Sequence, residues 1–424
     1  MKKKMIVLSI DSMIGEDLPL LNGLPNFSRI LQESSVVRKM RSTYPTLTHS
    51  VHTSIQTGCY PGRHGVINNE LCMPLTPKAP WYEDAAEVKC PTLPQVAARH
   101  GYRSAYLFWP VSMHADVPWN LHRAFIHTPK SHTQEDIRKR STPGLFDEVA
   151  PCVSRCWKLP HYECGDLFCS LSGAYLIRNY QPDIMYIHMV LIDHIRHIHG
   201  VFNDQLENAY AFLDRALGEL LNALDETDLW DSTIFCLTSD HGQLDITHSV
   251  SLNRLFADEG LCGISENGEM LWWDAYAHSC ALSAQIYIQN HDPEVTSRVR
   301  SLLDRHREAL GIGRIFTVEE TRVLYHSWGD YSFMVETDGK TGFGYDLSAP
   351  LICPVDNSDY RCSIASHGHI PENGPQPCFA VRNPFGKKTI TIEHGRIIDQ
   401  APTLARLLGF EMPDCDGSPI QELL

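Results

Sequence analysis

The stretch Met5-Ile-Val-Leu-Ser-Ile-Asp11 is a short apolar run that ends in an aspartate. A second stretch of the same kind is Thr233-Ile-Phe-Cys-Leu-Thr-Ser-Asp-His241, and a third run, 183–191, leads to Asp193. Short, continuous apolar runs are typical of strands that are buried on both faces of a parallel sheet. Each of the three predicted strands therefore ends beside a carboxylate.

Helical patterns separate these predicted strands. The sequence predicts helices over 25–31, 92–100, 203–228 and 401–408, and a further strand over 104–109. Alternation of this kind predicts an α/β fold, with a mostly parallel central sheet covered by helices on both faces. In such sheets a ligand binds at the carboxyl ends of the strands.

Two segments fit this rhythm poorly and are expected to be insertions that form a cap on a single catalytic domain, 1–424. The first covers about 111–173 and is rich in His, Pro and Cys. The second, about 260–349, is expected to be a small α+β unit. Its predicted parts are a strand (285–289), a helix (293–310) and a Gly-rich turn (337–344).

The composition is that of a globular protein, and its charge limits the partners. The chain has 424 residues, 43% of them hydrophobic, and a formal net charge of −15. A chain this acidic is a poor match for duplex nucleic acid, which needs a basic surface. An anionic substrate would need local positive charge, such as a bound metal. We therefore expect a small-molecule phosphoryl substrate, with a nucleotide among the candidates.

The same composition bears on the cellular location. No stretch approaches the roughly 18 apolar residues that a membrane span requires, so we expect a soluble protein without membrane contact. The apolar run near the N-terminus is interpreted as a strand, because it is short for a signal peptide. Fourteen cysteines are then better interpreted as reduced thiols, which predicts a cytoplasmic location.

Candidate metal ligands follow the predicted strands. Asp193 and His197 are four residues apart, which places both on one face of a helical turn, and Asp240 with His241 precedes a glycine. Mixed carboxylate and imidazole ligands suit zinc, and two sets of three would hold two ions about 4 Å apart. Each of these residues alone has a simpler explanation. An aspartate such as Asp11 often caps a helix, and His367 could be a loop histidine. Their joint occurrence favours the metal site.

The most specific indicator of function is a motif in two parts. The first part is Thr43-Tyr-Pro-Thr-Leu-Thr-His-Ser50, and the second is Thr57-Gly-Cys-Tyr-Pro-Gly-Arg-His-Gly-Val-Ile-Asn-Asn69. It resembles the nucleotide pyrophosphatase/phosphodiesterase family of the alkaline phosphatase superfamily. The strand-end motifs described above also have counterparts there, as does Ala401–Gly409. The resemblance covers roughly 4–110, 180–250 and 362–424, and it leaves both insertions uncovered.

The resemblance implies an activity and a set of residue roles. Thr48 would be the nucleophile of a phosphodiesterase that forms a phospho-threonine, and Asn69 would contact the phosphoryl oxygen. The implied ligands are Asp11, Asp240, His241 and the Thr48 oxygen for one Zn²⁺, and Asp193, His197 and His367 for the other. A metal-bound threonine hydroxyl is activated in the same way as metal-bound water. Thr48 could also simply cap the predicted helix that follows it.

Several alternatives stay open. Phosphonate or phosphomonoester hydrolysis could use the same site, because His49-Ser-Val-His52 departs from the family's usual Pro-Asn. A degenerate, non-enzymatic binding module should lack ligands, yet every position is filled. Cys59-Tyr-Pro-Gly-Arg63 spells a sulfatase motif, but its cysteine stands at the wrong position.

Other residues near the motifs have uncertain roles. His194 and His199 are candidates to support the ligands, and His369 competes with His367. The cysteines 152, 156, 164 and 169 could bind a structural metal but are better explained as reduced thiols. Trp272, Trp273, Tyr276 and His278 could stack on a nucleobase, although packing within the cap is the favoured reading. The leaving group and the oligomeric state cannot be read from the sequence.

Overall fold

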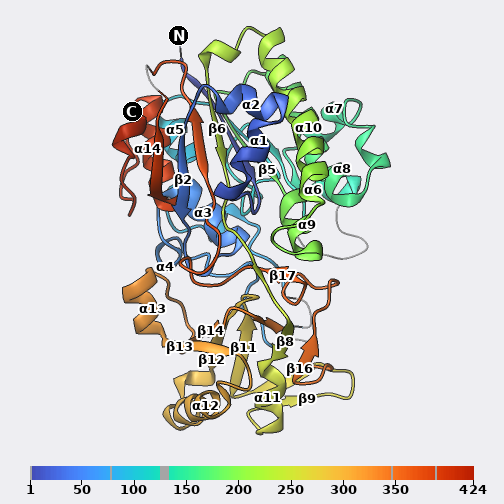
Figure 1. Cartoon of the computed structure of the whole chain (residues 1–424), viewed down its shortest axis with the longest axis vertical. Coiled ribbons are helices and arrows are strands. Elements are labelled where there is room, and N and C mark those ends of the chain that lie inside the picture. Colours follow the sequence, from blue (N-terminus) through green and yellow to red (C-terminus); the bar gives the residue numbers. More distant parts are fainter. Residues whose placement is uncertain (1, 77–78, 125–132, 345–346, 387–388) are drawn as a thin grey trace.

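A computed structural model describes residues 2–424 except 77–78, 125–132, 345–346 and 387–388. A large upper lobe, built around one long sheet, stands above a smaller β-rich lobe (Figure 1). In the described part of the chain, no helix is long and apolar enough to cross a membrane.

The upper lobe is built on an eight-stranded sheet with the order β19-β2-β18-β6-β1-β5-β3-β4. Its strands, in chain order, are β1 (Lys4–Ile10), β2 (Ser34–Arg41), β3 (Ser104–Leu107), β4 (Trp119–Leu121), β5 (Ile184–Met189), β6 (Thr233–Thr238), β18 (Phe379–Arg382) and β19 (Thr391–Arg396). All neighbouring pairs are parallel except those made by β18, which runs antiparallel to β2 and β6. The predicted, mostly parallel central sheet is confirmed.

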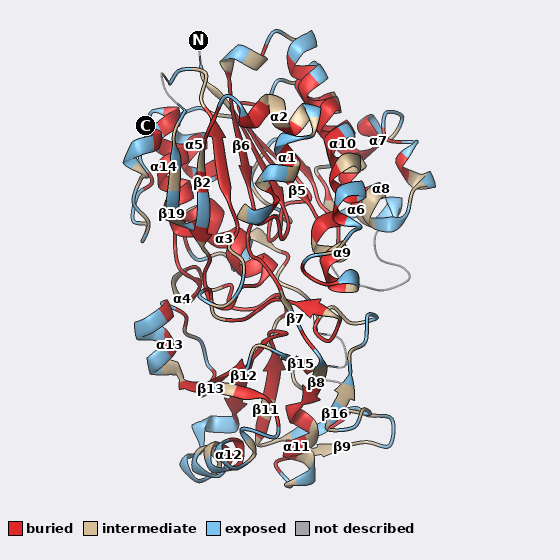
Figure 2. Cartoon of the chain, in the orientation of Figure 1, coloured by how far each residue is buried: buried red, intermediate tan, exposed pale blue. Residues whose placement is uncertain are grey.

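Helices cover both faces of this sheet because the side chains of its strands alternate between two cores. In β1, Ile6, Leu8 and Ile10 point into one core, whereas Met5 and Val7 point into the other. The first core is covered by α2 (Pro25–Leu31), α8 (His161–Asn179) and α10 (Leu206–Glu226). The second is covered by α3 (Thr48–Thr57), α5 (Leu93–Arg99) and α14 (Gln400–Leu408). Figure 2 shows the sheet buried between these two helical layers.

The smaller lobe has its own sheets and its own core. Its main sheet is antiparallel, with the order β11-β12-β14-β13, and its hydrophobic core is separate from the two in the upper lobe. The strands are β11 (Ala275–Ser279), β12 (Ser283–Ile288), β13 (Ile312–Thr317) and β14 (Phe333–Thr337). The helices are α11 (Leu252–Asp258), α12 (Pro293–His306) and α13 (Val318–Tyr325). The strand and the helix expected in this region are therefore present.

Two further small sheets complete the lobe, and one expectation about it needs correction. One sheet has the order β15-β8-β16, with β15 (Thr341–Gly344), β8 (His248–Ser251) and β16 (Ile352–Pro354). The other is the pair β10-β9, with β9 (Cys262–Ile264) and β10 (Met270–Trp273). The Gly-rich segment 337–344 is thus only partly a turn, because β15 pairs in parallel with β8. Glycine is needed there since a Cβ on Gly342 would lie 2.7 Å from the Arg361 carbonyl oxygen.

The expectation that 111–173 forms a cap is wrong for its described residues. β4 adds to the edge of the main sheet, and α8 packs against α10 and β5. Residues 125–132 lie outside the described part of the chain. The segment belongs to the core and not to a cap because side chains of α8, including Phe168 and Leu176, are buried on the sheet. The His, Pro and Cys content hid this packing in the sequence.

Candidate active site

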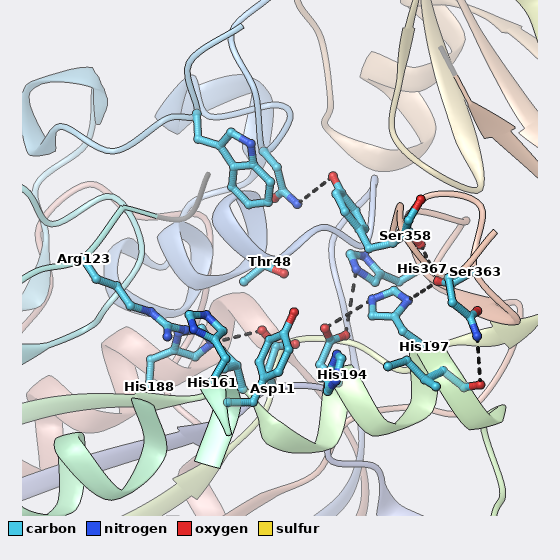
Figure 3. Close-up of a pocket in the computed structure, with 18 residues that line it drawn as sticks. Asp11, Thr48, Arg123, His161, His188, His194, His197, Ser358, Ser363 and His367 are labelled. Atoms are coloured by element: carbon cyan, nitrogen blue, oxygen red, sulfur yellow. Dashed lines mark hydrogen bonds and ion pairs between the residues drawn. The ribbon is translucent and has the colours of Figure 1, made fainter. Parts of the chain in front are cut away.

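A pocket of about 210 Å³ opens at the carboxyl ends of β1 and β5, where Asp11, His188 and Val190 line it. Asp11 follows β1, Asp193 lies in α9 (Leu191–His199) just after β5, and Thr48 begins α3. Figure 3 shows the Thr48 hydroxyl and the Asp11 carboxylate in the middle of this pocket. The carboxyl edge of the sheet is where the topology places a ligand.

The first group of candidate ligands consists of Asp11, Asp240 and His241, whose ligand atoms lie within 4.8 Å of one another. His241 Nε2 lies 3.1 Å from Asp240 Oδ2 and 3.6 Å from Asp11 Oδ1. The Thr48 hydroxyl oxygen is 3.4 Å from the same nitrogen. All four side chains are buried. The four residues that the sequence assigned to one ion are therefore neighbours in space.

The second group is Asp193, His197 and His367, again with ligand atoms within 4.8 Å of one another. His197 Nε2 lies 3.2 Å from Asp193 Oδ2, and His367 Nε2 lies 3.9 Å from Asp193 Oδ1. His197 Nδ1 donates to the Ala365 carbonyl at 2.6 Å, and His367 Nδ1 donates to the Thr46 carbonyl at 3.0 Å. Such backbone bonds orient a metal-binding imidazole, so both Nε2 atoms are directed into the site.

The residues present fit a pair of metal ions. Asp11 Oδ1, Asp240 Oδ2 and His197 Nε2 are buried without a hydrogen-bond partner, which is costly unless something else binds them. Burial and the nearby Asp240 raise the pKa of Asp11 well above its usual range, and burial raises the pKa of Asp240 to about 7. Carboxylates crowded in this way gain most from a bound cation. Among the described residues, these two groups are the ones whose geometry could hold a metal ion.

Thr48 occupies the first turn of α3, where backbone N–H groups and the helix dipole favour an anion. The His49 N–H donates to Asn69 Oδ1 at 3.0 Å. His52, one turn on, donates from Nδ1 to the Thr48 carbonyl at 2.8 Å, and its Nε2 lies 2.8 Å from the Ser9 hydroxyl. This network fixes the start of the helix and brings the Asn69 side chain to the pocket wall.

Sequence reasoning missed several residues that line the pocket. Tyr360 stacks on His367 with ring centroids 5.7 Å apart, and Asn69 Nδ2 lies 3.5 Å from its hydroxyl. Trp81 and Arg123 also contribute to the wall. These residues lie in loops without a recognisable motif. The only signal in the sequence was their aromatic or basic character, which many other positions share.

The structure also shows where the other histidines near the ligand motifs lie. His194 lines the pocket and stacks on Tyr162 at 3.6 Å, so it faces the site rather than away from it, whereas His199 is exposed. His369 Nδ1 donates to the Ile370 carbonyl at 2.8 Å, and His369 belongs to neither ligand group. The geometry therefore favours His367 over His369 as the candidate ligand.

The cysteine cluster and the cap aromatics do not form part of this site. All fourteen cysteines are free, and Cys152 is exposed while Cys156 is buried. No metal-binding group among the described residues contains a cysteine. Trp273 and Tyr276 pack against the core of the smaller lobe, as favoured from the sequence, and Trp272 is exposed on its surface.

An α/β core of this topology, with two Asp/His groups facing a threonine at its carboxyl edge, defines the class of alkaline phosphatase-like proteins. The family model of type I phosphodiesterase / nucleotide pyrophosphatase matches residues 5–360. The chain therefore belongs to this family of hydrolases, and the resemblance noted in the sequence is confirmed.

Individual relatives are distant. The venom phosphodiesterase of Macrovipera lebetinus is 25% identical over 257 residues, which are 59% of this chain and 26% of the venom protein. Ectonucleotide pyrophosphatase/phosphodiesterase family member 1 of Homo sapiens is 24% identical over 261 residues, which are 60% of this chain and 25% of the human protein. The chain thus matches only about a quarter of the length of these curated relatives.

Solved structures show the fold over the full length. Murine ectonucleotide pyrophosphatase/phosphodiesterase 5, as an inactive variant in complex with AMP, matches with a TM-score of 0.68 at 18% identity and covers 100% of both chains. The human protein of the same name matches with a TM-score of 0.66 at 17% identity, again over 100% of both chains. These likenesses confirm the alkaline phosphatase-like fold.

Proposed function

We propose that this protein is a zinc-dependent phosphodiesterase or nucleotide pyrophosphatase that acts through a covalent phospho-threonine at Thr48. The observation that carries the proposal is the position of the Thr48 hydroxyl, 3.4 Å from His241 Nε2 at the start of α3 and in the same pocket as Asp193 and His367. Membership in the phosphodiesterase family supports the reaction type. The bound AMP in a related structure supports a nucleotide as substrate.

The residues fit two Zn²⁺ ions in the arrangement expected from the sequence. Asp11, Asp240, His241 and the Thr48 oxygen would hold one ion, and Asp193, His197 and His367 would hold the other. When bound, the pair would supply Lewis-acid stabilisation of the attacking and leaving oxygens. The imidazole and carboxylate donors favour zinc over magnesium, which prefers oxygen ligands alone.

The protein's own groups then account for the two steps. The Thr48 oxygen attacks phosphorus, and the bond from phosphorus to the leaving oxygen breaks, which leaves a phosphorylated Thr48. Water then attacks phosphorus and releases the threonine. The Asn69 amide donates a hydrogen bond to charge on the non-bridging oxygens, and the N-terminal end of α3 favours the anion. Thr48 gives up its hydroxyl proton to solvent as it attacks, and the leaving oxygen takes up a proton from solvent. When water releases the threonine, a proton of that water returns to the Thr48 oxygen.

The test is hydrolysis of three compounds by zinc-loaded protein: p-nitrophenyl thymidine 5′-monophosphate, p-nitrophenyl phosphate and phosphonoacetate. We expect a preference for the first, and a loss of about a thousandfold or more in Thr48→Ala. Thr48→Ser keeps the hydroxyl and should retain measurable activity. A preference for the monoester or the phosphonate would support the alternative, which family membership does not favour. Near-wild-type turnover by Thr48→Ala would contradict the mechanism.

The cytoplasmic location remains a prediction. Its support is the set of fourteen free thiols, since disulfides form in oxidising compartments. Fractionation of the cells that produce the protein, with detection of the native chain, would test it. Recovery from the medium would contradict the prediction.

A further inference from the structure

The two groups of candidate metal ligands come from separate segments of the chain, and one buried ion pair joins two of these segments. Asp193 and His197 both lie in α9, so this helix supplies two of the three ligands of the second group. Figure 3 shows His197 rising from the helix into the pocket. Asp11, of the first group, lies in the turn between β1 and the 3₁₀ helix η1 (Gly15–Asp17). The ion pair connects α9 to η1.

The partners of this ion pair are Arg196 in α9 and Asp17 in η1. Arg196 Nη2 donates to Asp17 Oδ1 at 2.7 Å and to Asp17 Oδ2 at 2.6 Å. The Arg196 side chain is fully buried, and the Asp17 side chain is 6% exposed. A guanidinium keeps its positive charge in proteins, so the Asp17 carboxylate has to compensate a buried charge.

Further hydrogen bonds hold both partners in place. Asp17 Oδ2 also accepts the Tyr210 hydroxyl at 2.6 Å and the Ile14 N–H at 2.9 Å, so the carboxylate fixes the turn that follows β1. Arg196 Nη1 donates to the Val201 carbonyl, just beyond the end of α9. The ion pair therefore fastens the C-terminal end of α9 to the turn after β1.

The position of Arg196 in α9 links it to both ligands that this helix carries. Arg196 stands three residues after Asp193 and immediately before His197. Asp193 and His197 line the pocket, whereas the Arg196 side chain is directed to Asp17. Any rotation or sliding of α9 would move both ligand side chains together. The Arg196 anchor opposes such a movement.

Stability alone is the competing account of this ion pair. A buried ion pair contributes little net stability, because two charges have to be desolvated, and apolar residues can often replace it. A better attested role is to specify one arrangement of packed elements. Removal of one partner would destabilise the protein under either account, because the other charge stays buried and unpaired. A measurement of stability therefore cannot distinguish the two accounts.

We propose that Arg196, held by Asp17, is a positioning residue that sets the second ligand group relative to the first and so determines how tightly the second metal ion binds. This inference rests on the two-ion site of the proposed function. Partners that orient metal ligands commonly contribute a factor of about ten to a hundred in metal affinity. The first group should depend less on the ion pair, because Asp240 and His241 follow β6 and belong to neither α9 nor η1.

Zinc affinity tests the proposal, because its measurement needs no turnover. Competition with a chromophoric chelator gives the dissociation constants of the two ions. In Arg196→Met, we expect the dissociation constant of the second ion to rise about tenfold to a hundredfold and that of the first to change less than about threefold. Arg196→Lys should recover part of the loss. The first ion is measured separately in a His367→Ala background, where the second group lacks one ligand.

Arg382→Met is the matched control for the loss of a buried arginine. The Arg382 side chain is 4% exposed, and it donates to the Trp230 and Thr233 carbonyls. Thr233 begins β6, so this arginine lies at the end of the sheet away from the pocket. Arg382→Met should be less stable than wild type and should keep both zinc affinities. A selective weakening of the second ion in this control would overturn the proposal.

Tyr210→Phe is a milder variant that tests the same anchor if Arg196→Met does not fold. It keeps the ion pair and removes one hydrogen bond to Asp17. We expect the second ion alone to bind more weakly, by about twofold to tenfold, the usual effect of one hydrogen bond. Equal weakening of both ions in Arg196→Met, or wild-type affinities in Arg196→Met or in Tyr210→Phe, would contradict the positioning role.

A failure of the proposed enzymatic function would look different. A chain that binds two zinc ions but hydrolyses no phosphodiester would still report the effect of Arg196 on the second ion, so the positioning role would be tested all the same. A wild-type chain that binds fewer than two zinc ions would overturn the inference, because it would have no second ion to position.

Discussion

The imidazole rings of His241 and His367 stack face to face, with centroids 3.9 Å apart and ring planes inclined by 17°. One ring belongs to the ligand group around Asp11 and the other to the group around Asp193. Burial and the neighbouring His367 lower the pKa of His241 well below its usual range, and burial lowers the pKa of His367 to about 3. The two rings are therefore neutral, which is the form that binds a metal.

This geometry predicts that His367, and not His369, holds the second ion. His367→Ala should reduce the zinc content from two ions to about one per chain, as measured by mass spectrometry after dialysis, because one of three donors is lost. His369→Ala is the matched control and should keep both ions, since His369 Nδ1 bonds to the Ile370 carbonyl outside both groups. One ion lost from His369→Ala, with two kept in His367→Ala, would reverse the assignment.

Asn69 is expected to lower the barrier rather than to hold the fold. Asn69→Ala should reduce kcat by about a hundredfold to a thousandfold, the usual cost of removing a donor to a developing oxyanion. Asn69→Asp keeps the acceptor for the His49 N–H but loses the donor, so it should be similarly slow. Kinetics of both variants, with thermal unfolding as the control, would check this. Wild-type kcat in Asn69→Asp would rule out the donor role.

A buried ion pair fixes the loop that carries Tyr360. Arg361 pairs with Glu70, and both side chains are 8% exposed. Arg361→Met should cost about 3–5 kcal/mol of unfolding free energy, because it leaves the Glu70 carboxylate buried and unpaired. It should also reduce kcat/KM, since Tyr360 stacks on His367.

The loss of unfolding free energy is measured by denaturant unfolding of Arg361→Met and of a control variant. Arg322→Met is a suitable control because Arg322 pairs with Glu319 on the surface, where such pairs contribute about 1 kcal/mol or less. Equal stability losses in the two variants would contradict the assigned importance of the buried pair.

The junction of the two lobes should make stability depend on pH. Glu336 in β14 accepts the Tyr44 hydroxyl and the Ile370 N–H at 2.9 Å each. Burial raises the pKa of Glu336 to about 8 from its ordinary value of 4.5. Between these values the folded protein binds the proton and the unfolded chain does not, so stability falls as pH rises, by about 1.4 kcal/mol per pH unit.

Glu336→Gln removes this titration and should flatten the curve relative to wild type between about pH 5 and pH 8. Chemical denaturation at several pH values gives the difference in unfolding free energy between wild type and Glu336→Gln. The contributions of titrating groups that both proteins share cancel in this difference. Glu393→Gln replaces an exposed carboxylate that pairs with Lys39 and should leave the slope unchanged. A wild-type slope in Glu336→Gln would show that Glu336 is ionised in the folded protein.

Local patterns predicted much of the upper lobe. The helix over 25–31 and the strand over 233–238 have the expected bounds, because proline in a first turn and a continuous apolar run are strong local signals. The segment 111–173 was misinterpreted, since α8 buries polar residues such as Ser170 together with Phe168 and Leu176, and its packing on the sheet and α10 leaves no clear periodic pattern in the sequence.

The sequence by itself indicated which side chains could bind metal, because residue type and strand-end position limit that chemistry. Its resemblance to the phosphodiesterase family singled out Thr48 as the candidate nucleophile. Only the tertiary structure decided which residues share the pocket. His367, Tyr360 and Arg123 come from loops whose paths depend on long-range packing, and no local propensity encodes such packing. The roles of Thr48 and of the ligands stay predictions, whereas their closeness is a property of the fold.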